Sequence, residues 1–214
     1  MKLDVRTVGP FAENCYLVID EDARECVLVD PGDDGTEILA TVRASGATLT
    51  AIWCTHAHLD HIGAINTVRA VYPVPVHLHP LDLPFYTTLS ARAAAMYGVP
   101  WDQPEAPTTA IAEGDEMRCG ALRFTAMHVP GHAPGQVSFN GHGIALSGDL
   151  LFAGSIGRTD LPLCDPVAMD ASLGRIATLP PETVVYPGHG PATTIGAELE
   201  DNPFLSGRAR TLKR

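Results

Sequence analysis

One short stretch limits the possible folds and functions of this chain more than any other. Three histidines and one aspartate lie within the six residues from His56 to His61, in the pattern His-x-His-x-Asp-His. The apolar run 50–54 before it is typical of a buried strand, and residues 62–72 after it have the spacing of a short amphipathic helix. The cluster is therefore expected on a strand-to-helix loop, where α/β folds build their sites. Neutral imidazoles and carboxylates are good ligands for divalent metals. The pattern predicts a metal site rather than a polar loop with Asp60 as a helix cap.

The spacing within the cluster indicates two directions of ligation. His56 and His58 are two residues apart, so in an extended loop their side chains point the same way. Asp60 and His61 come at the turn into the helix and aim at a neighbouring point. They can therefore serve a second metal centre.

Length and composition limit the classes of protein to which this chain can belong. A chain of 214 residues with 45% hydrophobic content can bury a full core, and we expect one domain over residues 1–214. No apolar run approaches the length of a membrane span, and the N-terminus lacks the features of a signal peptide, so we expect a cytoplasmic protein without a membrane partner. The five cysteines are odd in number and far apart, which indicates reduced, mostly packed thiols and no thiolate zinc site.

The charge balance limits the kinds of partner that this chain can bind. The formal net charge of -11 opposes binding to nucleic acid or to anionic membrane surfaces, because both require clustered Lys and Arg. A small-molecule substrate fits better. The sequence leaves the oligomeric state open between monomer and homodimer.

Alternation and turn residues predict the remaining elements. Strands are expected at 2–8, 14–20, 25–30, 50–54, 74–79, 111–117, 121–128, 136–139, 144–147 and 183–186, and helices at 36–44, 62–72, 90–97, 166–179 and 195–200. Strands followed by helices in both halves suggest two sheets packed face to face with helices outside. Residues 80–108 form an apolar, aromatic, proline-bounded insertion. This insertion either lines the substrate site or merely covers the sheet.

Three further polar residues, His132, Asp149 and His189, follow predicted strands in glycine-rich turns. Each alone is weak evidence, because such turns are common. Together with the first cluster they supply five histidines and two carboxylates, enough for two metals if one carboxylate bridges. At this point the sequence resembles the metallo-β-lactamase fold superfamily, whose signature is His-x-His-x-Asp-His followed at long spacings by a His, a bridging Asp and a final His. The resemblance covers essentially the whole chain.

The resemblance implies an α/β fold, the αβ/βα four-layer sandwich, with two mixed sheets, helices outside and the site at the edge between the sheets. It also implies two divalent metal ions per chain, with zinc expected first and iron or manganese as alternatives. The implied ligands are His56, His58 and His132 for the first metal, Asp60, His61 and His189 for the second, and Asp149 as the bridge.

Within the superfamily, the segments 149–162 and 187–191 and the tripeptide 202–204 resemble short, single-domain glyoxalase II-like hydrolases. True β-lactamases of this fold commonly have Cys at the bridging position, where this chain has Asp149. The implied activity is hydrolysis of a small-molecule thioester such as S-lactoylglutathione, by attack of a metal-bridging hydroxide on the acyl carbon, with Asp60 and Asp149 as the catalytic carboxylates. Arg158 could bind an anionic tail of the substrate, although an ion pair with Asp160 or Asp165 is an equal alternative.

Two other activities use the same core. A persulfide dioxygenase would hold one iron through His56, His132 and Asp149, and a lactonase-type or phosphodiester hydrolase would use the same two metals. The complete second ligand group favours two metals over one. The sequence leaves the metal, the acyl group and the thiol carrier open.

Overall fold

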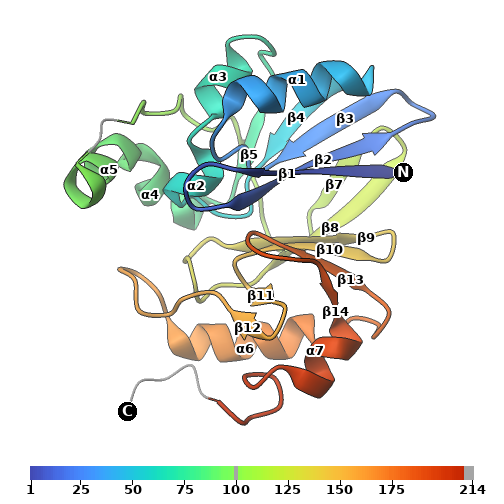
Figure 1. Ribbon diagram of the computed structural model, residues 1–214, viewed down its shortest axis with the longest axis vertical. Helices are drawn as coiled ribbons and strands as arrows, with labels where there is room; N and C mark the ends of the chain where they lie inside the picture. The colour runs from blue at the N-terminus through green and yellow to red at the C-terminus, as the bar shows by residue number, and fades with distance from the viewer. Residues whose placement is uncertain (99–100, 210–214) are drawn as a thin grey trace.

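Two six-stranded sheets form the centre of the computed structural model, which describes residues 1–98 and 101–209 (Figure 1). The first sheet has the order β1(Lys2–Val8), β2(Glu13–Asp20), β3(Glu25–Val29), β4(Thr48–Trp53), β5(Val76–Leu78), β6(Thr109–Ala110). The second has the order β14(Thr193–Thr194), β13(Val184–Pro187), β10(Ile144–Gly148), β9(Val137–Gly141), β8(Leu122–His128), β7(Glu116–Cys119). Both sheets are mixed: β3 to β6 run parallel, and so do β10 and β13, whereas the other paired strands are antiparallel.

Successive side chains along a strand belong to different layers of the apolar core. On β2, Cys15 and Leu17 belong to the core under the helices, while Tyr16 and Val18 belong to the core between the two sheets. This follows from the two-residue period of a strand, which sends successive side chains to opposite faces. Both faces of β2 are buried along its whole length, which explains the continuous apolar run at residues 15–19.

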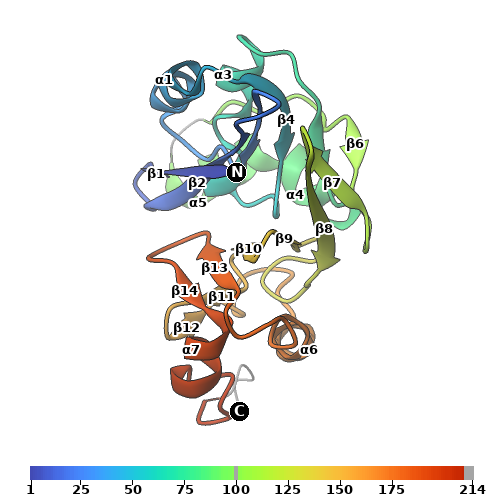
Figure 2. The same ribbon diagram turned by 90° about the vertical axis from the view of Figure 1, so that its right-hand side faces the viewer.

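Helices cover the outer face of each sheet (Figures 1 and 2). On the first sheet these include α1(Gly35–Ser45), α2(Leu59–Ile62), α3(Ile65–Arg69) and α4(Leu83–Thr87), and on the second α6(Pro166–Ile176) and α7(Ile195–Asp201). Between the sheets, Trp53 packs against Phe124 and Phe139 with ring centroids 5.7 and 5.3 Å apart. The arrangement confirms the predicted four-layer αβ/βα sandwich.

One predicted helix is divided. Residues 62–72 were expected to form a single helix, but the structure has α2 and α3, separated at Gly63 and Ala64. The amide of Ala64 donates to the carbonyl of Pro31 at 3.0 Å instead of continuing the helix. Because α2 starts at Leu59, Asp60 and His61 lie inside a helical turn rather than before it.

A single strand was expected at 111–117, and this prediction is also wrong. The chain leaves the first sheet after β6 and enters the second at β7, so these residues cross between the sheets. The side chain of Asp115 accepts a hydrogen bond of 2.7 Å from the amide of Ala112 and closes a turn within the crossing. Alternation cannot show that a strand-like run changes sheets.

A short hairpin of β11(Leu151–Phe152) and β12(Ser155–Ile156) was not indicated by the pattern either. Its second strand lies within the glycine-rich segment 152–160.

The insertion forms more structure than predicted. A 3-10 turn, η1(Pro80–Asp82), leads into α4 and then α5(Leu89–Tyr97), which corresponds to the helix expected at 90–97. None of the helices in residues 1–98 and 101–209 is long and apolar enough to cross a membrane.

Candidate metal centre

The site lies at the carboxyl ends of strands from both sheets. Asp30 follows β3, the histidine cluster follows β4, Asp149 follows β10, and His189 comes two residues after β13. Strands β3 and β4 are parallel neighbours in one sheet, and β10 and β13 in the other. Both parallel pairs therefore deliver their polar residues to the edge where the sheets meet, as the general rule for α/β sheets predicts.

The first ligand group contains His56, His58 and His132, whose ligand atoms lie within 4.8 Å of one another. The Nδ1 atom of His58 lies 2.8 Å from the Nε2 atom of His132. The loop after β8 thus brings His132, 74 residues along the chain, against the first cluster. The structure gathers these three residues as the sequence analysis expected.

The second group contains Asp60, His61 and His189, which meet the same distance criterion. The Nε2 atom of His189 lies 3.3 Å from Oδ2 of Asp60. A close contact supports this position: a Cβ atom on Gly32 would lie 1.6 Å from the carbonyl oxygen of Asp60, so only glycine lets the two loops approach this closely.

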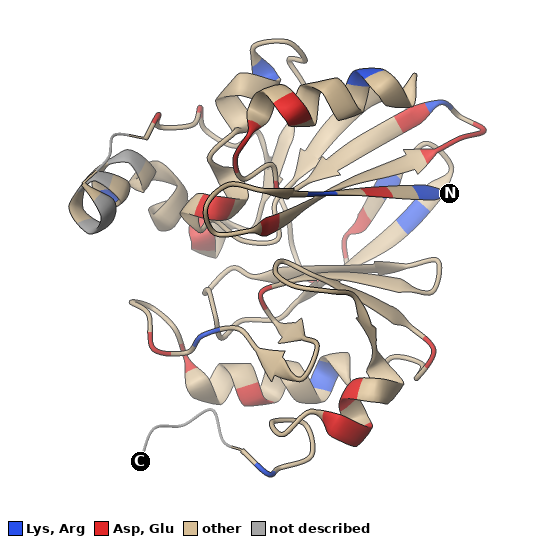
Figure 3. Cartoon of the chain, in the orientation of Figure 1, with Lys and Arg blue, Asp and Glu red and all other residues tan. Residues whose placement is uncertain are grey.

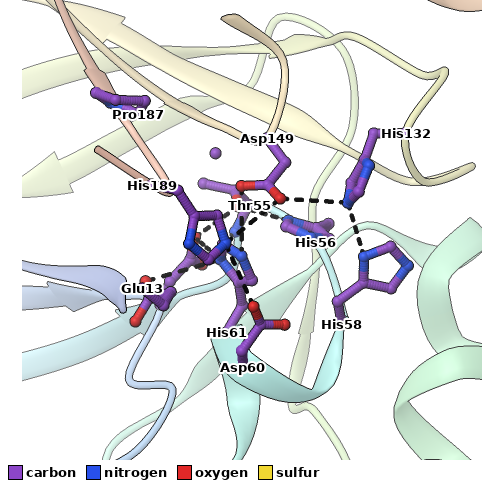
Figure 4. Close-up of polar contacts among 12 residues, drawn as sticks. Glu13, Thr55, His56, His58, Asp60, His61, His132, Asp149, Pro187 and His189 are labelled. Atoms are coloured by element: carbon purple, nitrogen blue, oxygen red, sulfur yellow. Dashed lines mark hydrogen bonds and ion pairs between the residues drawn. The ribbon is translucent and has the colours of Figure 1, made fainter. Parts of the chain in front are cut away.

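Asp149 lies between the two groups (Figure 4). Its Oδ1 atom is 3.5 Å from Nε2 of His61, and its Oδ2 atom is 3.4 Å from Nε2 of His132 and 3.6 Å from Nε2 of His189. One carboxylate therefore contacts imidazoles of both groups.

The donor atoms fit metal ions. The Nε2 atoms of His56 and His61 and the Oδ1 atom of Asp149 are buried and have no hydrogen-bond partner in the part of the chain that the structure describes. Buried polar atoms are almost always paired, so such orphaned atoms in one cluster indicate a missing partner. The far nitrogens of two other histidines are occupied: Nδ1 of His132 pairs with the carbonyl of Arg158 at 2.8 Å, and Nδ1 of His189 with that of Phe11 at 3.1 Å. A proton held on each Nδ1 leaves the Nε2 lone pair facing the site.

Asp30 is a buried supporting residue that the sequence analysis missed. Its Oδ1 accepts from the amide of Thr55 at 2.7 Å, and its Oδ2 accepts from the Thr55 hydroxyl at 2.6 Å and pairs with Nδ1 of His61 at 3.0 Å. The Thr55 hydroxyl in turn lies 3.0 Å from Nδ1 of His56. Asp30 thus orients one histidine of each group. Its position directly after a strand that neighbours the cluster was a signal that could have identified it.

Glu13 is a second buried carboxyl that sequence reasoning missed. It is completely buried, and its Oε1 atom lies 3.7 Å from Nδ1 of His61. Neither of its oxygens has a hydrogen-bond partner among residues 1–98 and 101–209. Burial raises the pKa of Glu13 well above its usual value. The residue falls at the start of a regular apolar strand, so nothing in the local pattern marks it.

The imidazoles of the first group are biased toward neutrality. Burial lowers the pKa of His56 well below its usual value, and it lowers the pKa of His58 to about 3. Neutral imidazole is the form that binds a metal.

The imidazoles of the second group are biased the other way. Burial lowers the pKa of His61, but the Asp149 and Asp60 carboxylates outweigh it and raise that pKa well above its usual value. For His189, burial is outweighed by the hydrogen bond to Asp60 and by the charge of Asp149, so its pKa is also raised. The two groups therefore differ in their affinity for protons.

A cavity of about 330 Å³ opens onto both groups and Asp149. Leu89, Arg92 and Ala93 of α5 form one wall, so the 80–108 insertion lines the cavity. The guanidinium group of Arg92 lies 4.0 Å from the ring centroid of Phe85, and that ring meets His58 edge-on at 5.1 Å. Arg158 lines the cavity as well, while its guanidinium pairs with Asp160 at 2.9 and 3.2 Å.

Four histidines that the sequence analysis left without a role lie outside both ligand groups and outside the cavity lining. Among them, His79 and His128 stack with ring centroids 4.2 Å apart, and the ring of His142 accepts a hydrogen bond from the amide of Arg123. The remaining one is His77.

All five cysteines are free, four of them buried, as expected.

The family model described as the metallo-beta-lactamase superfamily matches residues 8–189. The chain belongs to the metallo-beta-lactamase superfamily. Its relatives include the probable metallo-hydrolase YqgX of Bacillus subtilis strain 168, 37% identical over 212 residues that cover 97% of this chain and 99% of YqgX. The hydroxyacylglutathione hydrolase GloC of Haemophilus influenzae is 30% identical over 213 residues, 98% of this chain and 100% of GloC.

Solved structures of the metallo-beta-lactamase fold agree. The BLEG-1 B3 metallo-beta-lactamase has a TM-score of 0.90 at 36% identity, over 96% of this chain and 100% of BLEG-1. TTHA1623 in a di-iron-bound form has a TM-score of 0.86 at 46% identity, over 94% of this chain and 100% of TTHA1623. ETHE1 from Myxococcus xanthus has a TM-score of 0.80 at 29% identity, over 97% of this chain and 85% of ETHE1. Membership of this superfamily supports a metallohydrolase and leaves its substrate open.

Proposed function

We propose that this chain is a binuclear metallohydrolase that cleaves a small-molecule thioester of the S-lactoylglutathione type. The observation that carries the proposal is the position of Asp149, which contacts histidines of both three-residue groups described above. A third group that could hold a metal, Asp30, His56 and His61, shares one histidine with each of them. In the proposal each of the first two groups would hold one divalent ion, with Asp149 as a ligand shared between the two groups. Nitrogen and oxygen donors without thiolate suit zinc, iron or manganese.

Two ions held in this way would lower the pKa of a shared water and polarise the carbonyl group of the substrate. The chain's own residues set the geometry. Asp30 and Thr55 hold His56 and His61 in place from behind, which leaves their Nε2 atoms facing the site. Asp60 lines the cavity, so its carboxylate can orient the attacking water and accept its proton. The departing thiolate is already a good leaving group and requires no strong protein acid.

The cavity favours an anionic substrate with an apolar part. Its walls combine apolar side chains such as Leu89, Phe152 and Leu161 with the guanidinium groups of Arg92 and Arg158. In the same lining these two arginines lie beside the carboxylates of Asp60 and Asp149, whereas Asp and Glu are spread over both halves of the chain (Figure 3). The similarity to GloC, a hydroxyacylglutathione hydrolase, supports a glutathione thioester among such substrates.

Metal content per chain, measured on protein purified without added metal and combined with an assay of thiol release from S-lactoylglutathione, tests the proposal. We expect close to two metals per chain and thiol release that a chelator abolishes. Opening of a β-lactam is the matched comparison reaction, because BLEG-1 is a β-lactamase of the same fold. Two metals with β-lactam opening and no thiol release would contradict the thioesterase proposal.

A persulfide dioxygenase is the second candidate. Its single iron would be held by His56, His132 and Asp149, and in this chain Nε2 of His132 lies 3.4 Å from Oδ2 of Asp149. The similarity to TTHA1623 in a di-iron-bound form makes iron a realistic metal. The complete second group favours the hydrolase. One iron per chain, with oxygen consumption on glutathione persulfide, would favour the dioxygenase instead.

A further inference from the structure

Asp82 is a completely buried aspartate at the end of η1, where the insertion begins. Its Oδ2 atom accepts a hydrogen bond of 2.8 Å from the amide of Ala57, the residue between His56 and His58. Its Oδ1 atom accepts a hydrogen bond of 2.5 Å from the amide of Gly135, in the loop that carries His132. One side chain therefore joins the two loops that supply the first ligand group.

The packing around this contact leaves little freedom. A Cβ atom on Gly135 would lie 2.7 Å from the amide nitrogen of Asp82 and 2.8 Å from its Oδ1 atom, so the His132 loop rests directly on the aspartate. The second ligand group is held by other contacts. Asp30 holds His61, and Asn14 donates to the carbonyls of Pro187 and Gly190 on either side of His189.

We propose that Asp82 is a positioning residue for the first metal ion, because it fixes the His56–His58 loop relative to the His132 loop. The inference rests on the proposed function, since it takes these three histidines as metal ligands. A metal site tolerates little variation in its ligand distances. Mutation of a residue that orients metal ligands from behind typically lowers metal affinity about 10- to 100-fold. Asp82 acts on backbone amides rather than on imidazoles, so its effect is on loop position.

The test is the variant Asp82→Asn, which keeps the size of the side chain but turns one acceptor oxygen into an NH₂ group that faces a backbone N–H. Each protein is loaded with Co²⁺, and the two ions are removed with a competing chelator. We expect the first-site affinity of Asp82→Asn to fall about 10- to 100-fold, with second-site affinity retained. Reference Co²⁺ spectra from His58→Ala and His189→Ala, each lacking a ligand of one group, identify which ion is lost.

Asp20 offers a matched control. It is also a buried aspartate that accepts hydrogen bonds from backbone amides, here of Ala23 and Ala121, and it lies at the opposite end of β2 from Glu13. We expect Asp20→Asn to lower the stability of the fold and to leave both Co²⁺ affinities unchanged. Equal loss of first-site affinity in both variants, or equal loss of both ions from Asp82→Asn, would overturn the positioning role.

A measurement on the wild-type protein keeps the inference testable if Asp82→Asn does not fold. Hydrogen exchange at the amides of Ala57 and Gly135 should be slow, and it should slow further together when Co²⁺ is bound. Unprotected exchange of either amide in the loaded protein would contradict the inference. The failure of the proposed function is distinguishable, because it would show as fewer than two ions in the wild-type protein. Failure of the inference on Asp82 alone would show as two ions in the wild type and an unchanged first-site affinity in Asp82→Asn.

Discussion

The hydroxyl group of Tyr16 donates a hydrogen bond of 2.6 Å to the carbonyl oxygen of Pro187, 171 residues further along the chain. Tyr16 is on β2 of the first sheet, and Pro187 ends β13 of the second, two residues before His189. Asn14 donates to the same carbonyl at 3.1 Å and to that of Gly190 at 2.8 Å. The loop that presents His189 is therefore held by the opposite sheet.

Tyr16→Phe should loosen this loop. Removal of a buried hydrogen-bond donor costs roughly 1 to 3 kcal/mol of unfolding free energy, and the low end applies here because Asn14 still reaches the same carbonyl. We expect weaker binding of the second metal and unchanged binding of the first, measured by urea unfolding and chelator competition. Tyr86→Phe is the control, because the Tyr86 hydroxyl donates to the carbonyl of Glu105 at 2.7 Å, away from His189. If the two variants weaken metal binding equally, the assigned role of Tyr16 is wrong.

Acidification should release the second metal before the first. The pKa of His61 and that of His189 are raised by the neighbouring carboxylates, so as the pH falls these imidazoles protonate first and protons compete with the metal there. Burial lowers the pKa of His56 and His58, which therefore stay neutral to lower pH. Co²⁺ spectra recorded from pH 7 downward should lose the second-site signal first. Simultaneous loss of both signals, or the reverse order, would contradict this assignment.

Asp149→Ala should abolish the binding of both metals and all hydrolysis, because Asp149 contacts imidazoles of both groups. Metal analysis of the purified variant checks this directly. His189→Ala is the matched comparison and should keep the first metal, since His189 belongs to the second group alone. An Asp149→Ala protein with two metals and normal turnover would show that Asp149 does not bridge.

Arg92→Gln should weaken the binding of anionic thioesters. Loss of a charged hydrogen-bond donor costs about 1.5 to 3 kcal/mol, so we expect KM for S-lactoylglutathione to rise about tenfold or more, with little change in kcat. A thioester of neutral N-acetylcysteamine should show no such rise. Arg69→Gln controls for loss of charge, because Arg69 pairs with Glu105 and is not part of the cavity lining. Equal losses on both substrates would mean that Arg92 only supports the wall.

The structure brings together the two groups that the family resemblance implied, because their residues follow strands that end at the same edge of the two sheets. His56, His58 and His132 meet, and so do Asp60, His61 and His189. Asp82 and Arg92 could not be predicted in the same way. Their roles depend on how the insertion folds back over the site, and no periodic pattern records a hydrogen bond from residue 82 to residue 135. The strand expected at 111–117 was wrong for a related reason, because a change of sheet is a long-range event.

Each ligand group takes two side chains from residues 56–61, on the first half of the chain, and one from the second half. Bound ions would therefore be cross-links between the halves. A chain cut by a protease between β6 and β7, where it crosses from one sheet to the other, would keep these cross-links while loaded, and after chelation only the packing of the two sheets would hold its fragments together. Neither fragment could bind either ion with a full set of ligands, so metal loading reports that both halves have docked.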